Sequence, residues 1–404
     1  MNISVILPVE LITTEILLRL DVKSLMLLKC VSKPWNTLIS DPIFVKMHLK
    51  LSKSKGNLRL ALFSNKNLRL QIRSVGRGRS YTVTVAPTSV SLLLESTTSS
   101  IPLADDLQYQ FSCVDCCGII GSCNGLICLH GCFHGPGYKR HSFCFWNPAT
   151  RSKSKTLLYV PSYLNRVRLG FGYDNSTDTY KTVMLGITMD EGLGGNRMRT
   201  AVVKVFTLGD SIWRDIQSSF PVELALRSRW DDIKYDGVYL SNSINWLVRH
   251  RYKCQQKNLT TEQFVIISLD LETETYAQLQ LPKLPFDNPN ICVLMDCICF
   301  SYDFKETHFV IWQMKEFGVE ESWTQFLKIS YQNLGINYIV GHDGFLVLPV
   351  CLFENVATLI LAIKKGNQAV LYNLRDNKVK KIEKTNRIWW CVARDYVESL
   401  VSTC

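Results

Sequence analysis

The sequence has no hydrophobic run long enough to cross a membrane. Its longest apolar stretches, residues 291–300 and 344–353, have the length of a strand, whereas a membrane helix needs about eighteen or more consecutive apolar residues. The N-terminus lacks the basic segment of a secretory signal, and Glu10 and Glu15 interrupt its apolar residues. We therefore expect neither a membrane anchor nor secretion, and we expect the protein in the cytoplasm, the nucleus or both.

Catalytic motifs are also missing. The chain contains no HExxH, GxSxG or GxxxxGK[ST] pattern, and none of its seven histidines lies in a recognisable nucleophile or base context. We therefore expect a protein with no enzyme activity, no catalytic residues and no cofactor.

The fifteen cysteines show no disulfide-framework spacing and are odd in number, which favours reduced thiols. One group resembles a zinc site at first sight, namely Cys113, Cys116, Cys123, Cys128, His130, Cys132 and His134. The Cys113-x-x-Cys116 pair has usable ligand spacing. The other members alternate with apolar residues, as they would on strands, so we expect no metal here.

Acidic residues are absent from residues 51–80, where eight lysines and arginines supply most of the net charge of +11. Such a block can bind nucleic acid or an acidic partner. It can also be a solvated linker and the outer face of a hairpin, because polar and apolar residues alternate between residues 68 and 73. We favour the second interpretation and do not expect a nucleic-acid partner.

Helical periodicity is concentrated in residues 7–49. Apolar residues recur there at three- and four-residue spacing, and Asp21, Ser32 and Asp41 each precede an apolar-periodic segment. We therefore predict a first helix near Pro8 and three further helices that begin after these N-caps. The unit is too short to bury all its apolar residues against itself. The remainder either docks on the rest of the chain or binds a partner.

After residue 57 the pattern changes to short strand-like runs separated by turn residues. There are about two dozen such runs, with no long helix between them; they include residues 81–85, 90–94, 244–248, 292–302 and 358–363. So many strands must close on themselves or split into several sheets. We predict a small all-α N-terminal unit followed by an all-β propeller of about six to eight blades.

The N-terminal unit resembles the F-box of the large plant F-box family. The similar residues are Leu7-Pro8, Glu15–Leu17, Arg19-Leu20, Lys23–Leu25, Cys30–Lys33, Trp35, Leu38–Pro42 and Phe44–Leu49. The resemblance implies binding to a Skp-type adaptor and, through it, to a cullin–RING ubiquitin ligase. It implies that the adaptor-facing residues are Leu7, Pro8, Ile16, Leu17, Leu20, Leu25, Val31, Trp35 and Leu38.

The remaining chain is similar to the kelch-like F-box-associated interaction domain. The similarity rests on Gly121–Leu126, Trp146–Pro148, Gly170–Asp174, Gly237–Tyr239 and Trp312–Lys315. It implies an F-box at residues 1–50, a basic linker at 51–57 and a propeller at 58–404. It further implies a non-catalytic substrate receptor that presents a target protein for ubiquitination.

A target-binding loop is predicted from side-chain chemistry. Residues 226–236 carry Arg227, Arg229, Trp230 and Tyr235, and these residue types often dominate interface energies. Trp230 could instead fill a gap between blades. The alternative function is a propeller that binds nucleic acid through residues 51–80 or carbohydrate through its loops.

Overall fold

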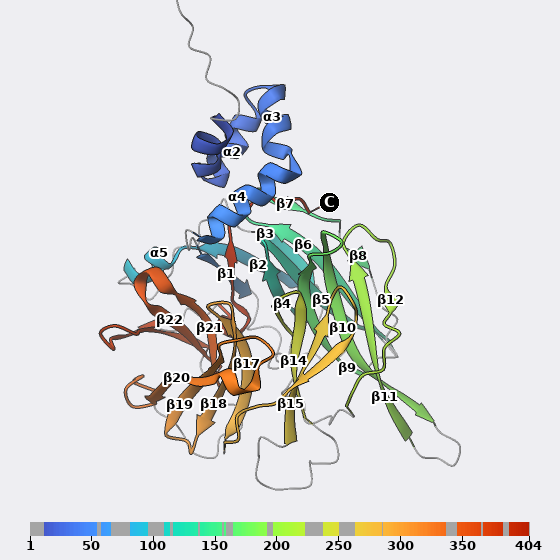
Figure 1. Cartoon of the computed structure of the whole chain (residues 1–404), viewed down its shortest axis with the longest axis vertical. Helices are drawn as coiled ribbons and strands as arrows, with labels where there is room; N and C mark the ends of the chain where they lie inside the picture. The colour runs from blue at the N-terminus through green and yellow to red at the C-terminus, as the bar shows by residue number, and fades with distance from the viewer. Residues whose placement is uncertain are drawn as a thin grey trace, which may run out of the picture.

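The computed structural model places a small helical unit on one end of a ring of β-sheets (Figure 1). The predicted fold class is confirmed. The structure describes residues 12–54, 58–65, 81–95, 109–113, 116–135, 138–155, 157–158, 165–191, 197–222, 237–249, 263–284, 286–336, 346–364, 367–382 and 388–403.

The helical unit contains two short turns and three α-helices, which are η1 (Ile12–Ile16), η2 (Leu17–Arg19), α2 (Val22–Lys29), α3 (Lys33–Ser40) and α4 (Pro42–Ser54). The helix α4 continues through residues 51–54, where we predicted the start of a linker. No helix in the described part of the chain is long and apolar enough to cross a membrane.

The predicted N-caps of these helices are confirmed. The Asp21 carboxylate accepts a hydrogen bond of 2.8 Å from the backbone N–H of Ser24, and the Ser32 hydroxyl accepts one of 3.4 Å from that of Trp35. The Asp41 carboxylate accepts a bond of 2.8 Å from the N–H of Ile43. Each cap satisfies backbone donors that the first helical turn leaves unpaired.

The sheets form six antiparallel blades. Blade 1 contains β25 (Arg394–Val397), β1 (Leu58–Asn65), β2 (Tyr81–Thr88) and β3 (Tyr109–Cys113). Blade 2 contains β4 (Cys116–Cys123), β5 (Leu126–Gly135), β6 (Tyr138–Asn147), β7 (Ser152–Lys153) and β8 (Leu157–Leu158). Blade 3 contains β9 (Asn165–Asp174), β10 (Thr179–Glu191), β11 (Arg197–Thr207) and β12 (Arg214–Asp215). Blade 4 contains β13 (Val238–Leu240), β14 (Ser243–Arg249), β15 (Phe264–Asp270) and β16 (Tyr276–Leu279). Blade 5 contains β17 (Asp287–Leu294), β18 (Cys297–Phe304), β19 (His308–Met314) and β20 (Trp323–Ser330). Blade 6 contains β21 (Val347–Phe353), β22 (Thr358–Ile363), β23 (Gln368–Asn373) and β24 (Val379–Ile382).

The two ends of the chain close the ring together. The C-terminal strand β25 pairs with the N-terminal strand β1, with Leu60 opposite Asp395, and forms the innermost strand of blade 1. The innermost strands β25, β4, β9, β13, β17 and β21 each contact the next one around the ring. Closure removes the open sheet edges that a row of blades would otherwise leave.

Two predicted strands are wrong in detail. Residues 90–94 belong to the helix α5 (Val90–Glu95), whose first turn is capped by Ser89, since its hydroxyl accepts a hydrogen bond from the N–H of Leu92. The predicted run 292–302 is two strands, β17 and β18. Between them Met295 and Asp296 form a turn with positive φ angles, a conformation that apolar periodicity does not reveal.

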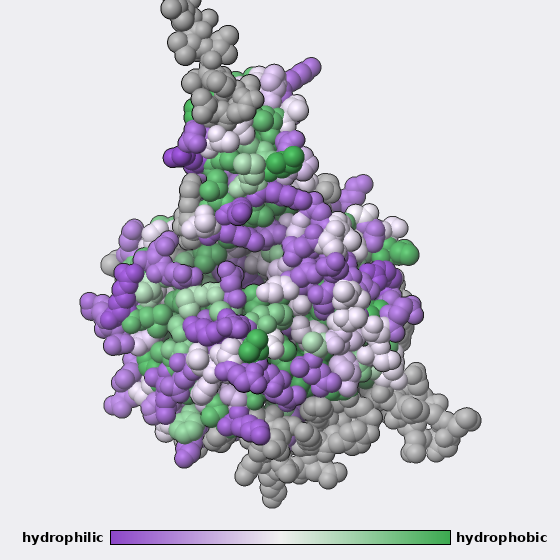
Figure 2. Space-filling view, viewed as in Figure 1, coloured by the Kyte–Doolittle hydropathy of each residue, from purple (hydrophilic) through white to green (hydrophobic). Residues whose placement is uncertain are grey.

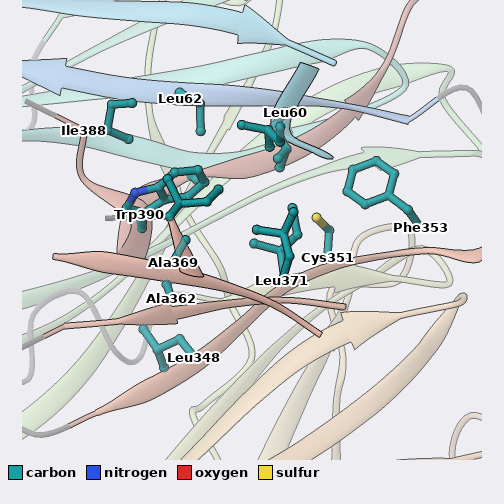
Figure 3. Close-up of a cluster of buried hydrophobic side chains, with 14 of the residues drawn as sticks. Leu60, Leu62, Leu348, Cys351, Phe353, Ala362, Ala369, Leu371, Ile388 and Trp390 are labelled. Atoms are coloured by element: carbon teal, nitrogen blue, oxygen red, sulfur yellow. The ribbon is translucent and has the colours of Figure 1, made fainter. Parts of the chain in front are cut away.

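The propeller core lies between the blades. The buried apolar residues form six clusters, and each cluster joins two adjacent blades. Figure 3 shows the cluster between blades 6 and 1, where Leu60 and Leu62 of β1 meet Leu371 of β23 and the buried Trp390. Every blade therefore depends on both neighbours for its buried surface.

Candidate adaptor and target interfaces

The helical unit has a small core that includes a residue from the far end of the chain. Leu17, Leu18, Val22, Leu25, Ile39 and Phe44 are buried together, and Leu400 joins them. The imidazole Nε2 of His48 on α4 donates a hydrogen bond of 2.9 Å to the carbonyl of Leu20. The helices therefore pack as one unit that rests partly on the C-terminal segment.

The same unit leaves large apolar side chains exposed. Val31 is 69% exposed and Leu27 is 65% exposed, and the other exposed residues are Ile16, Ile43, Met47 and Leu51. Figure 2 shows hydrophobic residues gathered on the helical unit above the propeller. An apolar patch of this kind on a small domain marks an interaction surface.

In the part of the chain that the structure describes, the helical unit contacts one end of the propeller. Lys46 and Lys53 of α4 contact Asp178 and Asn124, which lie in turns between the first and second strands of blades 3 and 2. Because the strands are antiparallel, second and third strands meet at the opposite end, as β10 with β11 and β14 with β15 (Figure 1). That end faces away from the helical unit.

A cavity of about 140 Å³ lies at the centre of the ring and is lined by the innermost strands of all six blades. Its polar residues include Asn290, Arg394 and Asp395, and the Ser122 hydroxyl donates a hydrogen bond to the backbone carbonyl of Asp395. Burial raises the pKa of the Asp395 carboxyl to about 6, whereas the neighbouring Arg394 acts in the opposite direction. Gly237, which follows the predicted target loop in sequence, also lines this cavity.

Two histidines of blade 2 form a close pair. The rings of His130 and His141 are stacked and share a hydrogen bond of 2.9 Å between Nε2 and Nδ1. Burial, together with His141, lowers the pKa of His130 to about 3. The His130 ring is therefore neutral near pH 7. A neutral ring suits its packing against Phe143 rather than a role in proton transfer.

The cysteines near this pair lie on strands, as the alternation predicts. Cys123, Cys128 and Cys132 are buried on β4 and β5, and burial raises the pKa of the Cys128 thiol well above its usual value. Across the described ranges, no three His, Cys, Asp or Glu side chains come together as metal ligands.

Comparison with known proteins assigns both parts of the chain. The model of the F-box domain matches residues 6–47, and the model of the F-box associated beta propeller domain matches residues 80–403. The chain belongs to the F-box-associated β-propeller family. It is 28% identical to the F-box/kelch-repeat protein At3g23880 of Arabidopsis thaliana, over 85% of this chain and 84% of that protein. It is 26% identical to the F-box protein CPR1 of the same plant, over 80% and 73% of the two chains.

This assignment makes the helical unit an F-box and supports a substrate-receptor role in an SCF-type ubiquitin ligase. F-box proteins are generally non-catalytic adaptors for substrates. The exposed apolar patch therefore lies on the module whose role is to bind an adaptor.

The predicted adaptor-facing residues lie in three different environments. Ile16 and Val31 are exposed, whereas Leu20, Trp35 and Leu38 are partly buried. Leu17 and Leu25 are fully buried and belong to the F-box core. Leu7 and Pro8 lie outside the described residues. The adaptor contacts of this set stay a prediction.

Four exposed apolar residues of the helical unit were not in the predicted set, namely Leu27, Ile43, Met47 and Leu51. A sequence signal for Leu27 does exist. Residues 25–28 are four consecutive apolar residues on a helix, and a helix cannot direct four consecutive side chains to one core. At least one of them must therefore face away from the core.

The predicted target residues Arg227, Arg229, Trp230 and Tyr235 lie outside the described residues, as do residues 66–80 of the basic block. The structure describes the chain again from Gly237, which leads into β13. The target contacts stay a prediction.

Proposed function

We propose that this chain is a substrate-receptor subunit of an SCF-type cullin–RING ubiquitin ligase. Its F-box binds a Skp-type adaptor, and its propeller binds a target protein. One observation carries the proposal: among the described residues, six of the eleven exposed large apolar side chains, Val31 and Leu27 among them, lie on the small F-box unit. The exposed set is a surface that an adaptor would cover.

In this role the chain breaks and forms no bonds itself. It raises the local concentration of a target near a ubiquitin-charged enzyme, so its contribution is proximity. The target binds at the end of the propeller opposite the F-box, because α4 occupies part of the other end. As the sequence analysis predicts, we expect this activity in the cytoplasm, the nucleus or both.

The adaptor interface is tested by binding to a purified plant Skp-type adaptor. We expect Val31→Asp to abolish binding, because it places a charge on the proposed apolar contact. Ile212→Asp is the matched control, since Ile212 is 71% exposed but lies on the propeller between β11 and β12. Equal binding by wild type and both variants would remove this surface from the proposal.

The double variant Leu7→Ala/Pro8→Ala tests the resemblance itself. We expect it to weaken adaptor binding while circular dichroism shows an unchanged propeller. Unchanged binding would mean that these two residues do not contact the adaptor.

The target interface is tested by capture of partners from plant cells in which the proteasome is blocked. We expect Arg229→Ala/Trp230→Ala to lose captured proteins that the wild type retains, while adaptor binding stays the same. An identical set of captured proteins at matched stability would exclude residues 226–236 as the contact.

A further inference from the structure

The last described residues, 398–403, lie between the F-box and the propeller. Leu400 is only 6% exposed and packs in the F-box core beside Leu17 and Leu25. The residues on either side of it face the propeller: Ser399 is fully buried, and Val401 packs against the cluster between blades 2 and 3. One short segment therefore contacts both domains with alternate residues.

Blade 2 holds this segment with a buried asparagine. The Asn147 amide Nδ2 donates hydrogen bonds of 3.0 Å to the carbonyl of Ser399 and 2.9 Å to the carbonyl of Val401. Its Oδ1 atom accepts a hydrogen bond of 3.0 Å from the N–H of Ala149 and thereby stabilises the turn that follows β6. Asn147 is fully buried, so these bonds are shielded from competing water.

A glycine makes room for the segment. Gly125 has φ +87°, and a Cβ atom on it would lie 2.1 Å from the Ser399 hydroxyl oxygen. Only glycine allows both this left-handed conformation and this approach. The turn between β4 and β5 is therefore shaped to receive the C-terminal segment.

The other contacts between the two domains are more exposed. Lys46 of α4 lies 2.5 Å from Asp178 and Lys53 of α4 lies 2.7 Å from Asn124, and both contacts are exposed. Exposed ion pairs of this kind contribute little to stability. Leu400 and Asn147 therefore supply buried contacts that these exposed pairs lack.

We propose that residues 398–403 act as a brace that sets the orientation of the propeller relative to the F-box. This inference rests on the proposed function, because the brace then fixes where a captured target lies relative to the ubiquitin-charged enzyme. Leu400 and Asn147 are its positioning residues. The brace is separate from ring closure, since β25 ends at Val397.

The test uses the full chain with its adaptor, cullin and RING subunits. Three variants remove the brace: a chain that ends at Val397, Leu400→Ala, and Asn147→Asp. The last variant keeps an oxygen for the N–H of Ala149 but places a carboxylate against the two carbonyls of the segment. Leu281→Ala is the matched control, because Leu281 is also 6% exposed but packs between blades 4 and 5.

Two measurements report orientation. Small-angle X-ray scattering of the receptor–adaptor complex gives its maximum dimension, and mass spectrometry identifies the receptor lysines that the assembled ligase ubiquitinates. For wild type and Leu281→Ala we expect one compact dimension and a restricted set of modified lysines. For the brace variants we expect a larger dimension and loss of that restriction, with adaptor affinity within about threefold of wild type.

The outcomes separate the two proposals. Failure of the wild type to bind the adaptor would overturn the proposed function. Binding by the wild type, with scattering and modified lysines unchanged in Asn147→Asp and in the chain that ends at Val397, would overturn the brace alone. Asn147→Asp decides the matter if Leu400→Ala fails to fold, because it leaves the F-box core intact.

Discussion

The F-box and the propeller differ in how they cover their apolar surface. In the propeller, each of six clusters is shared by two adjacent blades, and the ring ends where it began, at β1 and β25. The described F-box residues form one cluster, which includes Leu400 from the other end of the chain. Val31, Leu27 and Ile43 remain exposed.

The propeller therefore covers most of its apolar surface with its own blades, whereas the F-box needs contacts with residues outside its helices to cover its own. A closed ring of blades has no free edge and buries a large core, whereas a helical unit of about forty residues is marginal without support. The F-box obtains one part of that support from residue Leu400. In the proposed function, the adaptor supplies the other part.

The largest effect is expected from opening the ring. A chain that ends at Ala393 lacks β25, so β1 loses its inner neighbour and the cluster between blades 1 and 2 loses the buried Tyr396. We expect loss of cooperative thermal unfolding by circular dichroism, together with aggregation through the exposed edge. The chain that ends at Val397 is the control and should unfold cooperatively. Identical melting curves would contradict closure as the source of propeller stability.

The next effect tests a single junction of the ring. Trp246 is fully buried in the cluster between blades 3 and 4. We expect Trp246→Ala to lower the free energy of unfolding by about 3–5 kcal/mol, because it creates a large cavity. Leu27→Ala on the exposed F-box surface should change it by less than about 0.5 kcal/mol. Denaturant unfolding measures both, and comparable losses would contradict the contrast between the two domains.

Local sequence patterns were sufficient for much of the fold. Alternating apolar residues located most strands, and Asp21, Ser32 and Asp41 located three helix starts, because strand faces and caps depend on neighbouring residues. No predicted run covers β4, β25 or the two-residue strand β7. The strands β4 and β25 contact each other where the ring closes. The strand β25 has four residues, two of them the charged Arg394 and Asp395 that line the central cavity, so its strand identity depends on distant partners.

The candidate site was less predictable for the same reason. A stripe of apolar residues on the F-box does not distinguish core residues such as Leu25 from exposed ones such as Val31. That distinction depends on how the helices pack and on Leu400, which lies far away in the sequence. Asn147 could be assigned to a turn from the sequence, but its bonds to Ser399 and Val401 could not.

A smaller, pH-dependent effect should be confined to the propeller. The pKa of His130 is lowered to about 3, below the ordinary value for histidine, so below about pH 6.5 the unfolded chain binds a proton that the folded chain does not. This residue therefore contributes stability above about pH 6.5 and loses about 1.4 kcal/mol per pH unit as the pH falls.

The variant His130→Gln measures this contribution. The free energy of unfolding of the variant minus that of wild type should rise by about 2 kcal/mol as the pH falls from 6.5 to 5. This change does not depend on how far the two proteins differ at pH 7.5. Denaturant unfolding at several pH values gives the two curves. A constant difference between the two curves would show that folding does not lower the pKa of His130.

The smallest effect should be confined to the F-box. Asp21 caps α2 by accepting a hydrogen bond of 2.8 Å from the N–H of Ser24. The Ser24 hydroxyl and this N–H together lower the pKa of the Asp21 carboxyl. Asp21→Ala removes the cap and should cost the F-box about 1 kcal/mol, whereas Asp21→Asn keeps an acceptor and should cost only a few tenths of that. Amide hydrogen exchange resolves the two domains: protection of α2 should fall in the alanine variant while protection of the strands stays the same. Equal loss of protection in the propeller would show that the two domains unfold as one unit, and the contrast between an open F-box and a closed ring would then fail.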